Sequence, residues 1–230
     1  SEKNLIPGPW DKDGRREIYI KAQLSEQDHY LLKEHCENIG TKFLTSVFNI
    51  NDLKLLANLE LDMIKIPSHE VYNLELISGS LDIFDKILIS TGASNWLEIE
   101  QIVQLVPSEK LILMHCVSTY PCLAEKMNFP KMKKLLEYNG IVGYSGHYQG
   151  IDDAIVAICH GAIFIEKHFT IDNSLPGRDN KFAISPNQFN QLSKFRHHYQ
   201  KMNLDLGLDL QDCEKDTYDN YRGRWMGSLK

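Results

Sequence analysis

Six short, continuous apolar runs follow one another along this chain, and an amphipathic segment comes after each of them. Apolar runs without polar alternation indicate strands that are covered on both faces, which is typical of a parallel sheet. Strands that alternate regularly with helices form βα units. A series of this length closes into a barrel more naturally than it stays open, so the sequence predicts an α/β fold of the TIM-type (β/α) barrel kind.

The expected elements follow from the apolar runs and from helix-capping residues. Ser25 opens the first helix with Asp28 in the capping-box position, and Ser94 is expected to cap a later helix. Pro186 falls in the first turn of the last long helix, where proline is favoured. The predicted strands are residues 43–47, 63–67, 86–90, 111–116, 141–145 and 162–166. The predicted helices are residues 25–38, 50–61, 73–84, 94–106, 130–138, 151–160 and 185–199.

A complete barrel has eight strands, and the chain before residue 17 is too short to supply more than the six predicted here. We therefore expect a barrel that lacks its first one or two strands. The competing architecture is an open, doubly wound sheet, which would normally carry a glycine-rich turn after its first strand; the sequence has none. The expected organisation is an N-terminal arm (1–17), a partial barrel (18–208) and a linker or tail (209–230). The open edges would need cover from the arm or from a partner chain, such as a second copy in a homodimer.

Charge and composition exclude several classes of protein. The net charge is −6 with both signs interleaved, which argues against a nucleic-acid partner, because that needs a basic face. No apolar run approaches the length of a membrane span, and the N-terminus has no signal-peptide pattern. The five cysteines are irregularly spaced, so we expect free thiols in a reducing compartment and a cytoplasmic protein.

Polar side chains gather where each predicted strand ends. In a barrel, the carboxyl ends of the strands meet at one rim, and active sites lie there. The sequence therefore predicts a small-molecule site for acidic, phosphate-bearing substrates. The residues expected at this rim are Ser46, Lys65, Ser68, Glu70, Ser90, Thr91, Gly92, His115, Ser118, Tyr120, Ser145, His147, Glu166, Lys167 and His168.

Lys65 and the turn that begins at Ser90 each allow two interpretations. Lys65 lies inside an apolar strand, and a buried ammonium needs an anionic partner. That partner is either a substrate or a carboxylate of the chain, Glu166 or Glu70, in a structural ion pair. A Ser-Thr-Gly sequence after a strand is a common helix-entry turn, but its amides and hydroxyls also suit phosphate oxygens.

His147 and His168 end neighbouring strands. A lone histidine is more often a hydrogen-bonded core residue, whereas two at adjacent strand ends favour a divalent metal site with open positions, better suited to Mn²⁺ than to structural zinc. His115 either joins them or faces the barrel wall. Residues 176–179 form a turn by composition, which either stays a plain turn or folds over the barrel mouth and presents Asp179.

Several motifs together are similar to the catalytic barrel of the sialic acid (N-acetylneuraminate) synthase family, which includes synthases of related nonulosonic acids. The similarity runs from about residue 17 to residue 200. The motifs, in chain order, are KIPSHE (65–70), ISTG (89–92), HCVSTYP (115–121), GYSGH (143–147), IEKHFT (165–170) and LPGRD (175–179).

The resemblance implies condensation of phosphoenolpyruvate with an N-acyl hexose, such as N-acetylmannosamine or its 6-phosphate. The products are a nine-carbon keto sugar acid and phosphate, and the reaction needs a divalent metal, typically Mn²⁺, with Mg²⁺ or Co²⁺ as alternatives. By motif position, the metal ligands are His147 and His168, and Glu70 is a candidate for proton transfer. The residues implied to hold phosphoenolpyruvate are Lys65, Ser68, Ser90 and Ser145, with Ser46 and Ser118 nearby. Those implied to face the sugar are Glu70, Tyr120 and Asp179.

The chain departs from the family pattern at several points. Gly146 replaces an aspartate beside the metal histidine, and Ser118 replaces an asparagine near the pyruvyl group. We also expect the chain to lack the acidic residue and the lysine of the first two strands and the C-terminal antifreeze-like domain. A non-catalytic or truncated homologue that keeps the pocket is therefore an alternative, and a metal-dependent aldolase on the same scaffold is a second one.

Overall fold

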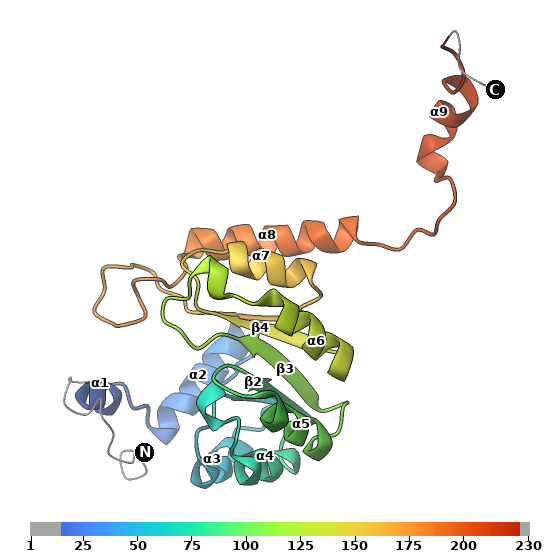
Figure 1. Ribbon diagram of the computed structural model, residues 1–230. Helices are drawn as coiled ribbons and strands as arrows, with labels where there is room; N and C mark the ends of the chain where they lie inside the picture. Colours follow the sequence, from blue (N-terminus) through green and yellow to red (C-terminus); the bar gives the residue numbers. More distant parts are fainter. Residues whose placement is uncertain (1–14, 226–230) are drawn as a thin grey trace. The chain divides into compact units, whose positions relative to one another are not determined.

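The computed structural model describes residues 15–225 (Figure 1). They fall into two compact units, which divide between Leu192 and Ser193. All the residues that the sequence places at strand ends belong to the first unit. The predicted N-terminal arm lies mostly outside the described residues. No helix in residues 15–225 has both the length and the apolar composition that crossing a membrane requires.

The strands of the first unit are short, and helices separate them. The strands are β1 (Met63–Ile66), β2 (Lys86–Ser90), β3 (Leu111–Cys116), β4 (Val142–Gly146) and β5 (Phe164–Lys167). The α-helices are α1 (Arg15–Lys21), α2 (Glu26–Asn38), α3 (Leu53–Asn58), α4 (Leu74–Leu81), α5 (Trp96–Leu105), α6 (Phe129–Asn139), α7 (Asp152–Cys159), α8 (Pro186–Met202) and α9 (Lys215–Asn220). Short 3₁₀ helices are Ile50–Asp52, Ser68–Glu70, Ala124–Lys126 and Asp212–Glu214.

The five strands form one parallel sheet in the order β1-β2-β3-β4-β5. Neighbours in sequence are therefore neighbours in space throughout, which is the arrangement of a barrel wall and not of a doubly wound sheet. The sheet curls into a half-barrel, with helices such as α4, α5 and α6 along its outer side (Figure 1).

One predicted strand was wrong in extent. Residues 43–47 form only an isolated parallel bridge, in which Ser46 pairs with Lys65. The Val47 amide donates to the Lys65 carbonyl, and the Lys65 amide donates to the Thr45 carbonyl. Leu44 is 41% exposed, so this segment lacks the cover that a central strand has on both faces. The sheet therefore has five strands with a bridging segment beside β1, where six strands were predicted.

Both faces of the sheet are apolar, which explains why the sequence runs are continuous. Outward-facing residues such as Ile64, Ile87 and Leu113 are fully buried in the main core between sheet and helices. Inward-facing Leu88 and Ile112 belong to a second, smaller cluster that forms the floor of the half-barrel. Burying one such side chain stabilises the fold by about 1.5–3 kcal/mol.

The capping predictions are confirmed with one exception. Ser25 and Asp28 form the expected capping box at the start of α2. Ser94 does not cap α5: its hydroxyl donates to the Thr91 carbonyl, and Asn95 is the cap, with Glu98 completing the box. No disulfide joins any of the five cysteines, all of which lie in the described residues, in agreement with the predicted free thiols.

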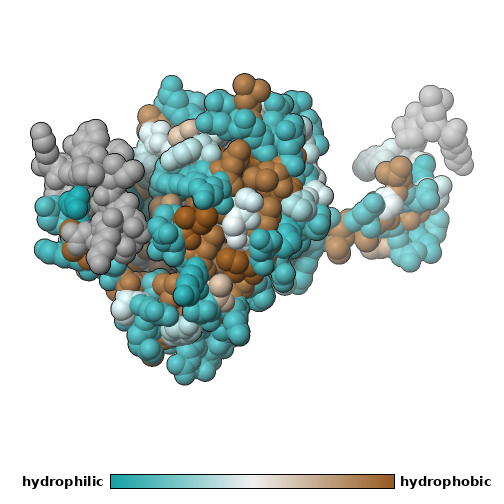
Figure 2. Space-filling model, turned by 90° about the horizontal axis from the view of Figure 1, so that it is seen from below, coloured by the Kyte–Doolittle hydropathy of each residue, from teal (hydrophilic) through white to brown (hydrophobic). Residues whose placement is uncertain are grey.

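Apolar side chains also reach the surface near the two edges of the sheet. Leu44 lies in the bridging segment, and Ile163, just before β5, is 57% exposed. Figure 2 shows hydrophobic residues gathered on one face of the molecule between polar ones. Large exposed apolar patches are typical of surfaces that another element covers, but cover by a partner chain stays a prediction.

Candidate active site at the carboxyl ends of the strands

Strand register places the polar side chains of the inner face next to one another. Cys116, Ser145 and Glu166 are Cα partners on β3, β4 and β5, so their side chains point to the same face of the parallel sheet. The apolar floor lies below them, because Met114, a member of the inner apolar cluster, precedes Cys116 by two residues on the same face of β3. The inner surface therefore changes from apolar to polar toward the carboxyl ends of the strands.

Lys65 forms its ion pair with Glu166, one of the two partners predicted from the sequence. Its Nζ lies 2.9 Å from Glu166 Oε2. The Lys65 side chain is only 7% exposed, whereas that of Glu166 is 47% exposed. A buried ammonium thus meets a carboxylate that water can reach, and an anionic ligand could take the same position.

Two of the hydroxyl groups predicted to hold phosphoenolpyruvate, those of Ser68 and Ser118, lie beside Gly92. The Gly92 amide donates to Ser68 Oγ at 3.1 Å. A Cβ at this position would lie 2.3 Å from Ser118 Oγ and 2.8 Å from Ser68 Oγ, so only glycine fits. Ser90 Oγ is buried and has no hydrogen-bond partner in the described part of the chain. Leaving such a group unpaired costs about 1–3 kcal/mol, and a ligand oxygen would satisfy it.

His147 is oriented by the backbone of the preceding loop. Its Nδ1–H donates to the Val117 carbonyl at 2.9 Å, so Nε2 is the ring nitrogen that a metal would bind. Burial lowers the pKa of His147, but hydrogen bonds to the Cys116 thiol and the Val117 carbonyl outweigh it, so the pKa is raised overall. The ring centroid lies 5.4 Å from that of His168.

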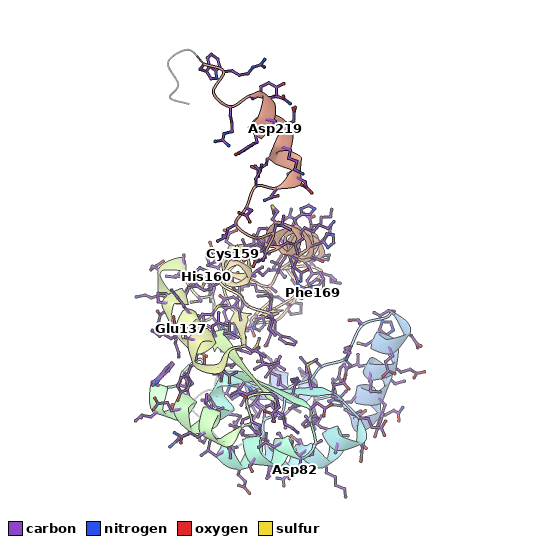
Figure 3. The ribbon with its side chains drawn as sticks, turned by 90° about the vertical axis from the view of Figure 1, so that its right-hand side faces the viewer. Asp82, Glu137, Cys159, His160, Phe169 and Asp219 are labelled. Carbon is purple, nitrogen blue, oxygen red and sulfur yellow. The ribbon has the colours of Figure 1, made fainter. Side chains whose placement is uncertain are left out.

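His168 lies at the end of β5 beside the loop that follows it. Its Nδ1 is 3.8 Å from Asp179 Oδ2, so this loop does bring Asp179 to the barrel mouth. Burial lowers the pKa of His168, and the Asp179 carboxylate only partly opposes this effect. Phe169, labelled in Figure 3, packs edge-on against Phe189 of α8 and thereby anchors the start of the loop.

Tyr120 covers both histidines. Its ring centroid is 4.0 Å from that of His147 and 6.2 Å from that of His168. Burial, with the nearby Cys116, Asp179 and Glu166 groups, raises the pKa of Tyr120 to about 12. The phenol therefore stays protonated at neutral pH and is able to donate a hydrogen bond to a ligand.

Three residues lie elsewhere or contribute differently. Glu70 accepts a hydrogen bond from the Asn73 side chain at the start of α4, so its role in proton transfer stays a prediction. Ser46 is connected to the site through its backbone bridge with Lys65. His115 faces the barrel wall: its Nε2–H donates to the Met127 carbonyl, and burial lowers its pKa to about 4, so it stays neutral.

Lys167 was wrongly placed at the rim with Glu166 and His168. Successive residues of a strand point to opposite faces, and Lys167 lies behind the sheet with Asp153. Gly146 also faces that side, where a Cβ would lie 2.3 Å from Asp153 Oδ2. The alternation of side-chain direction along a strand would have predicted that Lys167 faces away from Glu166 and His168.

Cys116 is a site residue that the sequence reasoning passed over. It lies on the inner face of β3 and contacts the Gly92 turn. Burial raises the pKa of the thiol, but hydrogen bonds to His147, Ser68 and Ser118 outweigh this, so the pKa is lowered. Cys116 stands two residues before Ser118, so the alternation of side chains along the strand would have predicted that both face the site.

The candidate metal ligands, His147 and His168, offer two imidazoles. Over the described residues, no group of three or more His, Cys, Asp or Glu side chains is arranged to hold a metal ion. Two neighbouring histidines, one with its Nε2 oriented by a carbonyl bond, suit an ion that keeps open positions for water or substrate.

The chain is similar to known proteins over most of its length. The family model described as "NeuB family" matches residues 2–205. N,N'-diacetyllegionaminic acid synthase of Legionella pneumophila is 33% identical over 199 residues, which cover 83% of this chain and 55% of that protein. N-acetylneuraminate-9-phosphate synthase of Drosophila melanogaster is 30% identical over 80% of this chain and 50% of its own length. The chain thus spans about half the length of these relatives.

A solved structure shows the same architecture. The sialic acid synthetase of Leptospira borgpetersenii, in complex with citrate, superimposes with a TM-score of 0.84 and 27% identity, over 94% of this chain and 77% of that one. That structure is a TIM-type barrel, which the half-barrel described above matches. With a family model over most of its length and relatives above 30% identity, this chain belongs to the NeuB family of sialic acid synthases and related sugar acid synthases.

Proposed function

We propose that the protein condenses phosphoenolpyruvate with an N-acyl amino sugar, such as N-acetylmannosamine or its 6-phosphate, to a nine-carbon keto sugar acid. The observation that carries the proposal is the convergence of Lys65, His147 and His168 at one end of the half-barrel. Glu166 links them, since it pairs with Lys65 and its charge acts on both imidazoles.

Phosphoenolpyruvate would bind at the inner hydroxyl groups. Lys65 would neutralise its charge, exchanging the Glu166 carboxylate for a ligand oxygen. Ser90 Oγ, which is buried and unpaired in the described structure, would donate to the ligand. Ser68 and Ser118 line the same turn at Gly92, and Ser145 lies on the neighbouring strand.

The amino sugar would bind above, between Tyr120 and the loop that carries Asp179. The Tyr120 phenol would donate to a sugar oxygen, because its raised pKa keeps it protonated. His147 and His168 would hold a divalent cation, which we propose is Mn²⁺, with Mg²⁺ or Co²⁺ as substitutes. When bound, such a cation would supply Lewis-acid polarisation of the sugar aldehyde.

The reaction balances without a further cofactor. The enol carbon C3 of phosphoenolpyruvate attacks the aldehyde carbon, forming the new C–C bond. Water adds to C2, and the C2–O bond to phosphate then breaks, giving the keto acid and inorganic phosphate. Glu70 remains our candidate for moving the proton from this water, although Asn73 holds its carboxylate in the described structure.

Two other functions compete with synthesis. A non-catalytic homologue would keep phosphoenolpyruvate binding but lack turnover, which the position of Glu70 against Asn73 would favour. A metal-dependent aldolase on the same scaffold would release pyruvate.

Phosphate release separates the three functions. The full chain would be incubated with Mn²⁺, phosphoenolpyruvate and N-acetylmannosamine, its 6-phosphate or a diacetamido hexose, with His147→Ala as the control. A synthase releases phosphate with at least one sugar, and His147→Ala does not. Phosphoenolpyruvate binding without release from any sugar supports the non-catalytic function, and pyruvate formation supports an aldolase.

A further inference from the structure

We propose that the buried ion pair of Lys167 and Asp153, on the helix side of the sheet, is a positioning device that sets the distance between His147 and His168. The inference rests on the proposed metal site. It identifies residues that never touch the metal but determine how well the two imidazoles are placed for it.

The Lys167 ammonium is fully satisfied by three acceptors. Its Nζ lies 2.8 and 3.0 Å from the two Asp153 carboxylate oxygens and 2.8 Å from the Tyr148 carbonyl. The side chains of Lys167 and Asp153 are only 4% and 1% exposed. The Tyr144 hydroxyl donates to Asp153 at 3.0 Å, so the carboxylate is also fixed from the strand.

This network joins the two chain segments that carry the histidines. Lys167 directly precedes His168, and Tyr148 directly follows His147. The β4–β5 ladder ends at the pair Gly146 and Lys167, one residue before each histidine. The bond from Lys167 to the Tyr148 carbonyl continues the connection between the two segments just where the ladder stops.

Gly146 is the residue that makes room for this arrangement. A Cβ at position 146 would lie 2.3 Å from Asp153 Oδ2 and 2.5 Å from the Tyr144 ring. The glycine beside the candidate metal ligand His147 is therefore required by the network behind it.

A positioning role of the Lys167–Asp153 pair can be separated from a purely stabilising one by experiment. Replacing both members of a buried ion pair by apolar residues of similar volume is often neutral for stability. Residues that orient metal ligands, in contrast, typically change metal affinity about 10- to 100-fold when altered. If both Lys167 and Asp153 are replaced by apolar residues, a positioning role therefore predicts weaker metal binding, and a purely stabilising role does not.

The test compares Mn²⁺ affinity and thermal stability in the full chain. Free Mn²⁺ is measured by electron paramagnetic resonance during titration of wild type and of Lys167→Met/Asp153→Leu. We expect the double variant to keep its cooperative melting transition but to bind Mn²⁺ at least about 10-fold more weakly. The control is Leu135→Ala, a buried α6 position, which should lower Tm and leave Mn²⁺ affinity unchanged.

A second variant covers the case in which the double variant does not fold. Asp153→Asn keeps the shape and an acceptor oxygen for Lys167 but removes the negative charge, and we expect an intermediate Mn²⁺ affinity. Wild-type Mn²⁺ affinity in either folded variant would overturn the inference. If His147→Ala also binds Mn²⁺ like wild type, the metal site itself is wrong; if His147→Ala loses binding, only the positioning role fails.

Discussion

Lys65 shows how one side chain connects the fold to the proposed chemistry. Its backbone pairs with the bridging segment on one side and with β2 on the other, while its ammonium lies in the barrel interior. A cation in this position is costly unless an anion is close. Glu166 meets that need in the described structure, and its own half-exposed carboxylate is accessible to water.

Replacing Lys65 by methionine should weaken phosphoenolpyruvate binding without unfolding the protein. Hydrogen bonds to charged groups contribute about 1.5–3 kcal/mol, which corresponds to roughly 10- to 100-fold in the dissociation constant. Stability should change little, because the released Glu166 carboxylate can be hydrated. Isothermal titration with phosphoenolpyruvate and a thermal melt check both parts. Unchanged affinity in Lys65→Met would show that the ligand binds elsewhere.

The two candidate metal ligands predict a pH dependence for Mn²⁺ binding. A metal binds the neutral imidazole, so protons compete with it. The pKa of His147 is raised above its usual value of 6.5, whereas that of His168 is lowered. As pH falls, His147 therefore gains a proton first, and Mn²⁺ affinity should drop with a midpoint above 6.5. Titrations between pH 5.5 and 8.5 measure this, and an affinity that is constant down to pH 6 would contradict it.

Most of the site could be predicted from residue type and place at a strand end. Lys65, His147 and His168 converge as expected, because parallel strands end at one rim. The orientation of Lys167 was missed, since neighbouring residues of a strand face opposite sides and the motif alone does not say which. Glu70 lies in a 3₁₀ turn after β1, whose direction the sequence pattern does not determine.

Element boundaries follow local side-chain bonds more closely than apolar periodicity. The start of α5 offers two capping candidates, Ser94 and Asn95. Glu98 decides between them, since it stands three residues after Asn95 and completes a capping box. The segment 43–47 is apolar enough for a strand, but its pairing depends on neighbours that periodicity does not reveal.

The caps give a prediction for stability. Asn95→Ala should lower the free energy of unfolding by about 1 kcal/mol, because the Glu98 amide at the start of α5 loses its acceptor, Asn95 Oδ1. Ser94→Ala is the matched control and should cost less, since its hydroxyl bonds a single carbonyl outside the helix. Urea unfolding of both variants gives the comparison. If Ser94→Ala lost more unfolding free energy than Asn95→Ala, then Ser94 and not Asn95 would be the residue that caps α5.

The barrel-type architecture could be predicted because βα alternation and doubly covered strands are visible in the sequence. The strand order confirms it against the doubly wound alternative. The division of the chain near Leu192 could not be predicted, since α8 runs through that point without a break in its helical pattern.

If the proposed function is right, phosphoenolpyruvate and a divalent cation bind together at the carboxyl end of this half-barrel. Mn²⁺ is paramagnetic, so the ³¹P relaxation of phosphoenolpyruvate reports whether the two ligands share a pocket. We expect strong Mn²⁺-dependent relaxation in the wild-type chain and its loss in His147→Ala. Phosphoenolpyruvate that binds with a ³¹P relaxation rate unaffected by bound Mn²⁺ would show that the two ligands do not share a pocket.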